Sequence, residues 1–192
     1  MNVSCAAFVL PALLVVGATS AVSRGTNAEP SSQVSQPIDF SGPHGFDFEF
    51  GEWKVHHRIK RQDQWIEMDG TCTDRPAMDG SANIEEHTFN RPEGITRGMA
   101  VRAYDPKTGL WAIWWIDGRN PHNTMDPPMK GSFVKGVGTF YAEGNLNGQP
   151  TRYRFIWSHI TKSSARWEQA SSADKGKTWD TNWVMEFVRI QG

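Results

Sequence analysis

Apolar and polar residues alternate along most of the chain after residue 50. In the first such segment, Trp53, Val55, His57 and Ile59 share one face of an extended strand, and the basic residues between them share the other. Further strands are expected at 64–70, 71–78, 82–89, 98–104, 110–117, 132–141, 151–160, 165–171 and 179–190. About ten short strands without a long helix indicate an all-β barrel or sandwich.

The segments between these strands carry turn signals. Asp105-Pro106-Lys107-Thr108-Gly109 is suited to a hairpin turn, and 44–50 is expected to form a short helical turn across one end of a barrel. The glycine-containing segment 132–141 is expected to bend or bulge. The longest loop inside the domain, 117–129, should lie at a barrel end, where it is either a lid or a plain connection.

Two structural motifs stand at the two ends of the domain. Gly51 and Trp53 open the first strand, and Arg189 in the last strand is available to stack on the Trp53 indole. This pair resembles the closure of lipocalin-like barrels, and the resemblance implies one antiparallel up-and-down β-barrel of eight to ten strands, closed at one end by the pair. Near the C-terminus, 172–179 matches the Asp-box pattern, in which Asp174, Gly176 and Trp179 hold a turn together; one copy indicates a hairpin clip and no glycosidase.

The chain from Phe46 to Arg189 resembles a family of uncharacterised bacterial lipocalin-like proteins. The resemblance rests on Phe46-Asp47-Phe48, residues 51–58, Tyr104-Asp105-Pro106, Trp111, Trp115, Asp117, residues 166–170, Trp179 and residues 182–187. It implies a calycin-like barrel and no established activity. At fold level such a barrel is similar to fatty-acid-binding proteins and nitrobindin-like haem barrels, although fold alone does not specify a ligand.

The N-terminal segment differs in composition from the domain. Residues 6–18 form an apolar run of signal-peptide length, followed by small residues at which cleavage after Ser20 or Ala21 is expected. The predicted organisation is a signal peptide at 1–21, a disordered linker at 22–43 and the barrel at 44–192, with a retained N-terminal anchor as the alternative. Cleavage would leave Cys72 as the one cysteine, which favours a bacterial periplasm or secretion without disulfides.

Composition limits the classes of partner. Twenty Lys and Arg residues against 21 Asp and Glu residues give a formal net charge of −1, which argues against nucleic acid or an anionic membrane as partner. No membrane span is expected after signal cleavage. All nine tryptophans lie between Trp53 and Trp183, so they favour a barrel with an aromatic wall that binds a small apolar or amphipathic molecule.

Candidate binding residues follow from the strand faces. We predict a ligand lined by His57, Trp114, Trp157 and His159, with Glu86 as the buried acid. Asp117 and Arg119 are the predicted gate. Because a one-residue shift of register inverts every face, the alternative site is Arg58, Arg154 and Glu168 on the opposite faces.

Other chemistry remains open at this level. The six histidines show no His-x-His or His-Glu-x-x-His spacing, so no metal site is predicted, and haem ligation through His57 or His159 is an alternative. A cofactor-independent enzyme would use Glu85 or Glu86 with His57 or His159 for proton transfer. A third alternative is a protein-interaction module, with the apolar strand 111–115 forming a homodimer.

Overall fold

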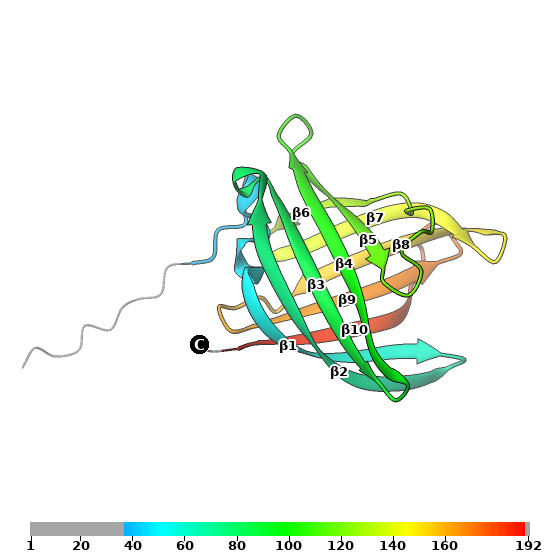
Figure 1. Cartoon of the computed structure of the whole chain (residues 1–192). Coiled ribbons are helices and arrows are strands. Elements are labelled where there is room, and N and C mark those ends of the chain that lie inside the picture. The colour runs from blue at the N-terminus through cyan, green and yellow to red at the C-terminus, as the bar shows by residue number, and fades with distance from the viewer. Residues whose placement is uncertain (1–36, 191–192) are drawn as a thin grey trace, which may run out of the picture. The chain divides into compact units, whose positions relative to one another are not determined.

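A computed structural model describes residues 37–190, and these form a single closed sheet (Figure 1). Two 3₁₀ turns, Gly42–His44 (η1) and Asp47–Glu49 (η2), precede the strands, and a third, Met78–Gly80 (η3), connects two of them. The strands are β1 (Gly51–Arg61), β2 (Gln64–Ala77), β3 (Ala82–Arg91), β4 (Gly94–Asp105), β5 (Leu110–Asp117), β6 (Met129–Val134), β7 (Val137–Leu146), β8 (Gln149–Ser158), β9 (Ser164–Ser172) and β10 (Asp180–Arg189).

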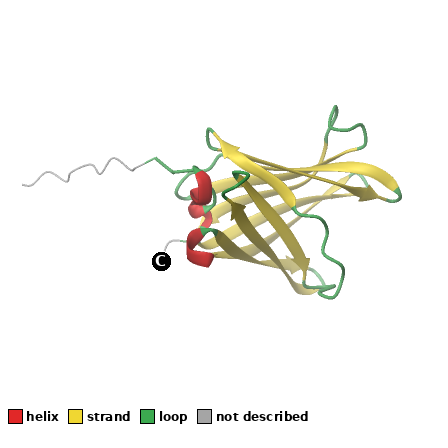
Figure 2. Ribbon diagram, turned by 90° about the horizontal axis from the view of Figure 1, so that it is seen from above, coloured by secondary structure: helices red, strands yellow, loops and turns green. Residues whose placement is uncertain are grey.

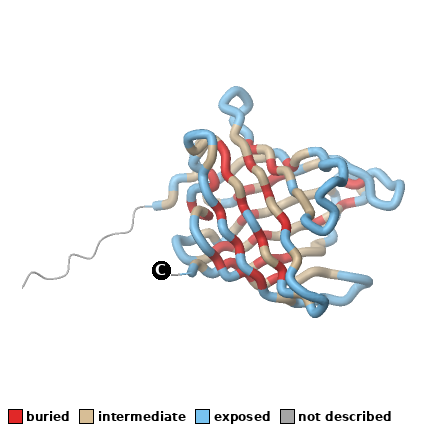
Figure 3. Tube along the Cα trace, viewed as in Figure 1, coloured by how far each residue is buried: buried red, intermediate tan, exposed pale blue. Residues whose placement is uncertain are grey.

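Each strand pairs antiparallel with its neighbours in sequence, and β1 pairs with β10 to close the barrel. This is the predicted up-and-down β-barrel. Buried and exposed residues alternate along the strands, as Figure 3 shows, because successive side chains point into and out of the barrel. No helix in residues 37–190 is long and apolar enough to cross a membrane.

The division of the chain into strands differs from the prediction in two places, where two expected strands are one and one expected strand is two. The strands expected at 64–70 and 71–78 are one strand, β2, because Gly70 marks a close approach of backbones and not a turn: a Cβ there would lie 2.0 Å from the Thr88 carbonyl oxygen. The strand expected at 132–141 is instead two strands, β6 and β7, joined by Lys135 and Gly136, which both have positive φ.

Arg189 closes one end of the barrel together with Trp53. The guanidinium carbon lies 4.0 Å from the centroid of the Trp53 ring, and its nitrogens donate to the carbonyl oxygens of Phe48, Phe50 and Lys162. The Trp53 indole N–H donates to the Glu49 carbonyl oxygen at 2.6 Å. The end where η1 and η2 lie, at left in Figure 2, is called the closed end below.

An aromatic cluster fills the barrel just inside the closed end. Phe46 is fully buried, and its ring contacts those of Phe48, Trp111, Phe133, Phe140 and Trp157. Phe40 stacks on Phe133 with ring centroids 5.4 Å apart. The packed unit therefore begins before the predicted boundary at His44, and the end of the predicted linker belongs to it; the rest of the linker and the predicted signal peptide lie outside the described residues.

The opposite, open end carries the long loop and the Asp-box hairpin. The Asp174 carboxylate accepts hydrogen bonds from Thr178 Oγ1 at 2.6 Å and from the Thr178 and Lys177 amides, which hold its pKa well below the ordinary value. Gly176 has φ of +89° there. Trp179 packs on the outer surface beneath the Arg154 guanidinium, whose central carbon lies 4.3 Å from the ring centroid. The motif is a hairpin clip, as predicted.

Replacing Trp53 with Ala should lower the free energy of unfolding by about 3–5 kcal/mol, because it removes a fully buried ring and leaves Arg189 without its stacking partner. Denaturant unfolding of the two proteins measures this difference. Trp65→Ala is the matched control, since Trp65 is 39% exposed at the open end and its loss should cost less than about 1 kcal/mol. Equal stability of parent and Trp53→Ala would contradict the closure.

Candidate functional site

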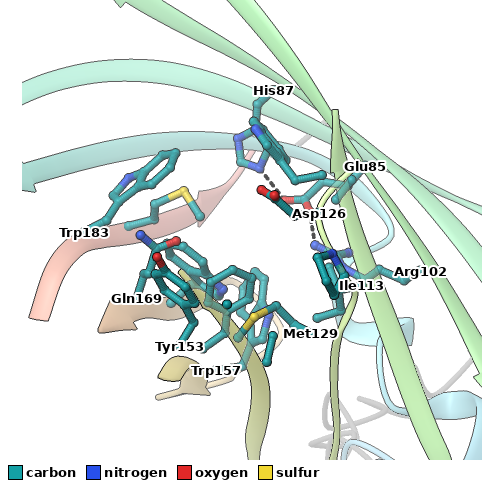
Figure 4. A pocket seen from close by; sticks show the side chains of 18 of the residues that line it. Glu85, His87, Arg102, Ile113, Asp126, Met129, Tyr153, Trp157, Gln169 and Trp183 are labelled. Carbon is teal, nitrogen blue, oxygen red and sulfur yellow. Dashed lines mark hydrogen bonds and ion pairs between the residues drawn. The ribbon is translucent and has the colours of Figure 1, made fainter. Parts of the chain in front are cut away.

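A cavity of about 360 Å³ occupies the barrel between the aromatic cluster and the open end (Figure 4). Its walls are mostly apolar and aromatic, and Asp126, Glu143 and Asn145 add polar groups to its lining. The apolar lining comprises Phe89, Ala100, Ile113, Trp115, Pro127, Met129, Ala142, Phe155, Trp157, Trp167, Trp183 and Met185. Glu85, His87 and Arg102 form the main polar group in its wall, and Tyr153 and Gln169 approach from other strands.

The polar wall is built by the pairing of β2 and β3. In this register Cys72 lies opposite His87, and Asp74 lies opposite Glu85. All four side chains are buried and alternate with outward-facing neighbours. The two cross-strand pairs therefore lie next to each other on the inner face of the barrel. Glu85 Oε1 is hydrogen-bonded to His87 Nε2 and lies 3.5 Å from the Cys72 sulfur.

Arg102 of β4 connects these four residues to the closed end. Its guanidinium donates to Glu49 at 2.7 Å and to Glu85, and lies 3.9 Å from Asp74. It also lies over the Phe46 ring, 4.5 Å from the centroid. Three buried carboxyl groups thus face one buried guanidinium. Because burial penalises the charged form, it raises the pKa of Glu49 and raises that of Asp74 to about 8, despite the nearby arginine.

Two buried histidines lie beside this network. Burial lowers the pKa of His57 to about 3 and that of His87 to about 4, so both imidazoles are neutral at physiological pH. Within the described residues, neither ring nitrogen of His57 makes a hydrogen bond, and nor does Nδ1 of His87. The His57 ring packs instead on Phe89, with centroids 4.8 Å apart.

The predicted site residues divide between the two faces. Trp157 is buried and lines the cavity, and His57 is buried inside the barrel, although it does not line the cavity. The prediction of Glu86 as the buried acid is wrong, because its side chain is 62% exposed on the outer face beside Arg75. Glu85 is the buried carboxyl. Glu86 was expected inside because it shares a strand face with the apolar Ile84. In the structure that face points outward, and the more polar face of β3 points into the barrel.

Trp114 and His159 also lie away from the cavity. Trp114 is on the outer face of β5, whereas Trp115 lines the cavity. His159 is exposed beyond the end of β8, at the closed end, so it cannot ligate a group held inside the barrel. The alternative set of Arg58, Arg154 and Glu168 faces outward, and Glu168 there accepts a hydrogen bond from Arg166 at 2.9 Å.

The long loop does lie at the open end, but other residues of it approach the cavity. Asp117 and Arg119 bind each other through several hydrogen bonds, the shortest 2.5 Å, and do not line the cavity. Asp126 and Pro127 line it instead. β5 pairs with β6 only from Trp111 to Ile113, so beyond Ile113 β5 is paired on its β4 side alone.

Sequence reasoning missed Arg102 and Glu49. The alternation of Ala100, Arg102 and Tyr104 along β4 was the available signal for Arg102, since these residues share the inner face. Glu49 had no periodic signal, because it belongs to the 3₁₀ turn η2.

The chain matches no protein-family model and no curated protein sequence. The resemblance to bacterial lipocalin-like proteins therefore stays a prediction, whereas the barrel itself is observed.

Asp74 makes stability depend on pH in a direction that can be tested. Its folded pKa of about 8 exceeds the ordinary value of 3.8, so the stability it contributes is present in acid and is lost as pH rises from about 4 to about 8. Asp74→Asn removes this titration, and the variant should gain free energy of unfolding relative to the parent across that range, as measured by denaturant unfolding. An Asp74→Asn profile parallel to that of the parent would refute the assignment.

Proposed function

We propose that the protein is an exported barrel that binds one small amphipathic molecule in its cavity. The observation that carries this proposal is the cavity itself: about 360 Å³, walled by aromatic side chains, with a compact polar group at one point of its wall. Small-molecule sites in proteins have this composition and roughly this size, about 300–1,000 Å³. Export is inferred from the apolar run at 6–18, which lies outside the described residues.

The lining suggests how such a molecule would lie. Its apolar body would contact Phe155, Trp167 and Trp183, where each Å² of buried apolar surface contributes about 25 cal/mol. Its polar group would face Arg102, Glu85 and His87. The indole N–H of Trp157, a cavity residue, makes no hydrogen bond within the described residues, so it offers a further donor.

Filling the cavity should abolish binding without unfolding the barrel. Ala142→Trp projects an indole into the cavity and should weaken binding of the fluorescent dye 1-anilinonaphthalene-8-sulfonate by at least about tenfold, which is about 1.4 kcal/mol. Fluorescence titration measures this change.

Val134→Trp is the control, because it adds the same ring at an exposed position of β6 and should bind the dye as the parent does. Native mass spectrometry of protein purified from its own host identifies the natural ligand. An empty barrel there, together with no dye binding by the parent, would refute the proposal.

A second candidate function, cofactor-independent proton transfer, is favoured by one observation. Glu85 and His87 are hydrogen-bonded to each other, both line the cavity, and both are almost fully shielded from water. A carboxylate and an imidazole at one point of a dry cavity can remove a proton from a bound molecule and return it. His57 and His159, the histidines first considered for this role, do not line the cavity.

The adjacent residues Glu85 and Glu86 provide a matched pair for testing this second function. The probe is 5-nitrobenzisoxazole, whose N–O bond breaks and releases a coloured phenolate when a base removes the ring C–H proton. If Glu85 is a general base, the parent accelerates this reaction and Glu85→Gln slows it by about 10²–10⁴-fold, whereas the outward Glu86→Gln leaves the rate unchanged. Equal rates for the parent and both variants would exclude Glu85 as the base.

A further inference from the structure

Three side chains that commonly ligate transition metals meet at the polar wall, where two of them, Glu85 and His87, line the cavity. Cys72 on β2 and Glu85 and His87 on β3 each offer one ligand atom, and these three atoms lie within 4.8 Å of one another. All three residues are buried, and Cys72 lies directly opposite His87 across the two strands. The spacing of these residues along the chain gives no metal motif, because the site comes from cross-strand register and not from a local repeat.

We propose that Cys72, Glu85 and His87 bind a divalent transition-metal ion, with zinc as the expected metal, and that the fourth coordination position faces the cavity. Thiolate, imidazole and carboxylate together form a donor set that zinc prefers, and three protein ligands with one open position are typical of zinc sites that bind a further molecule. Glu85 and His87 line the cavity, which gives the open position its direction. This proposal does not depend on the amphipathic ligand proposed above.

The surroundings of the three ligands fit a cation. Arg102 holds Glu85 through Oε2, while Oε1 faces His87 and Cys72, so the two carboxylate oxygens have separate partners. A 2+ ion would be balanced by the Cys72 thiolate and the Glu85 carboxylate, and Arg102 balances Glu49.

Asp74 supplies a second observation that points to a ligand at this place. It lies opposite Glu85 and next to Cys72 on the same inner face, and its side chain is fully buried. Neither of its carboxylate oxygens accepts a hydrogen bond within the described residues. Its charge partner Arg102 lies 3.9 Å away, too far for a hydrogen bond, and a metal-bound water beside it would provide the missing hydrogen bond.

Binding must release the thiol proton of Cys72. A triad that is only hydrogen-bonded, with the thiol donating to Glu85, would bind no metal at any pH.

Cobalt(II) titration of the full chain tests the site, because cobalt replaces zinc and reports its ligands in the absorption spectrum. The parent should bind one equivalent and show both a thiolate-to-cobalt charge-transfer band and the intense visible bands of tetrahedral cobalt, and zinc should displace it. Cys72→Ala should lose the charge-transfer band and weaken zinc binding by at least about tenfold, and His87→Gln should weaken it similarly.

His159→Gln and Glu86→Gln are the matched controls, since both residues lie outside the barrel interior and should leave the spectrum and the zinc affinity unchanged. Thermal unfolding checks that each variant is folded. The spectrum of the parent decides the question even where a variant does not fold. A parent that binds no cobalt, or binds it without the charge-transfer band, would overturn the proposal, and so would a folded Cys72→Ala variant with parental zinc affinity.

Discussion

The position of Arg189 determines much of what lies inside this barrel. Its guanidinium stacks on Trp53 and binds the carbonyl oxygens of Phe48 and Phe50, so the last strand, the first strand and the turn that crosses the closed end are fastened together. Glu49 lies between those two carbonyl groups and is thereby fixed inside the barrel, where it meets Arg102. A contact that closes the fold also supplies one wall of the candidate site.

Arg102 then organises the polar wall. A buried guanidinium requires charge partners and hydrogen-bond acceptors, and Glu49 and Glu85 provide them. Because Arg102 holds one oxygen of Glu85, the other oxygen is directed toward His87 and Cys72. In other proteins, replacing a buried ion network with apolar residues is often neutral or stabilising, so this concentration of buried charge supports the proposed site more than it explains the stability of the fold.

The cavity exists because the barrel is filled from one end only. The aromatic cluster around Phe46 occupies the closed end, and the long loop borders the open end with Asp126 and Pro127. The short pairing between β5 and β6 makes this loop a part of the cavity wall. A segment outside the ladder of the sheet thus lines the cavity near its open end.

The sequence by itself determined the class of fold, the closure and the hairpin clip. Each rests on local pattern: alternation predicts strands, Gly51 and Trp53 open the first strand in a recognisable way, and Asp174 with Gly176 defines a turn within a few residues. The pairing of Arg189 with Trp53 follows from the resemblance to lipocalin-like barrels, and the register of β1 with β10 confirms it.

Only the tertiary structure decided which face of each strand points inward. Alternation separates Glu85 from Glu86, but it does not say which of them is inside, and the usual assumption that the more apolar face is buried fails where the interior holds a polar network. Because of the same ambiguity, Trp114 is the residue that the sequence predicts in the cavity, whereas Trp115 is the one that lines it. The approach of Cys72 to His87, and of Arg102 to Glu49, depends on strand register and barrel closure, which bring together residues that no spacing along the chain connects.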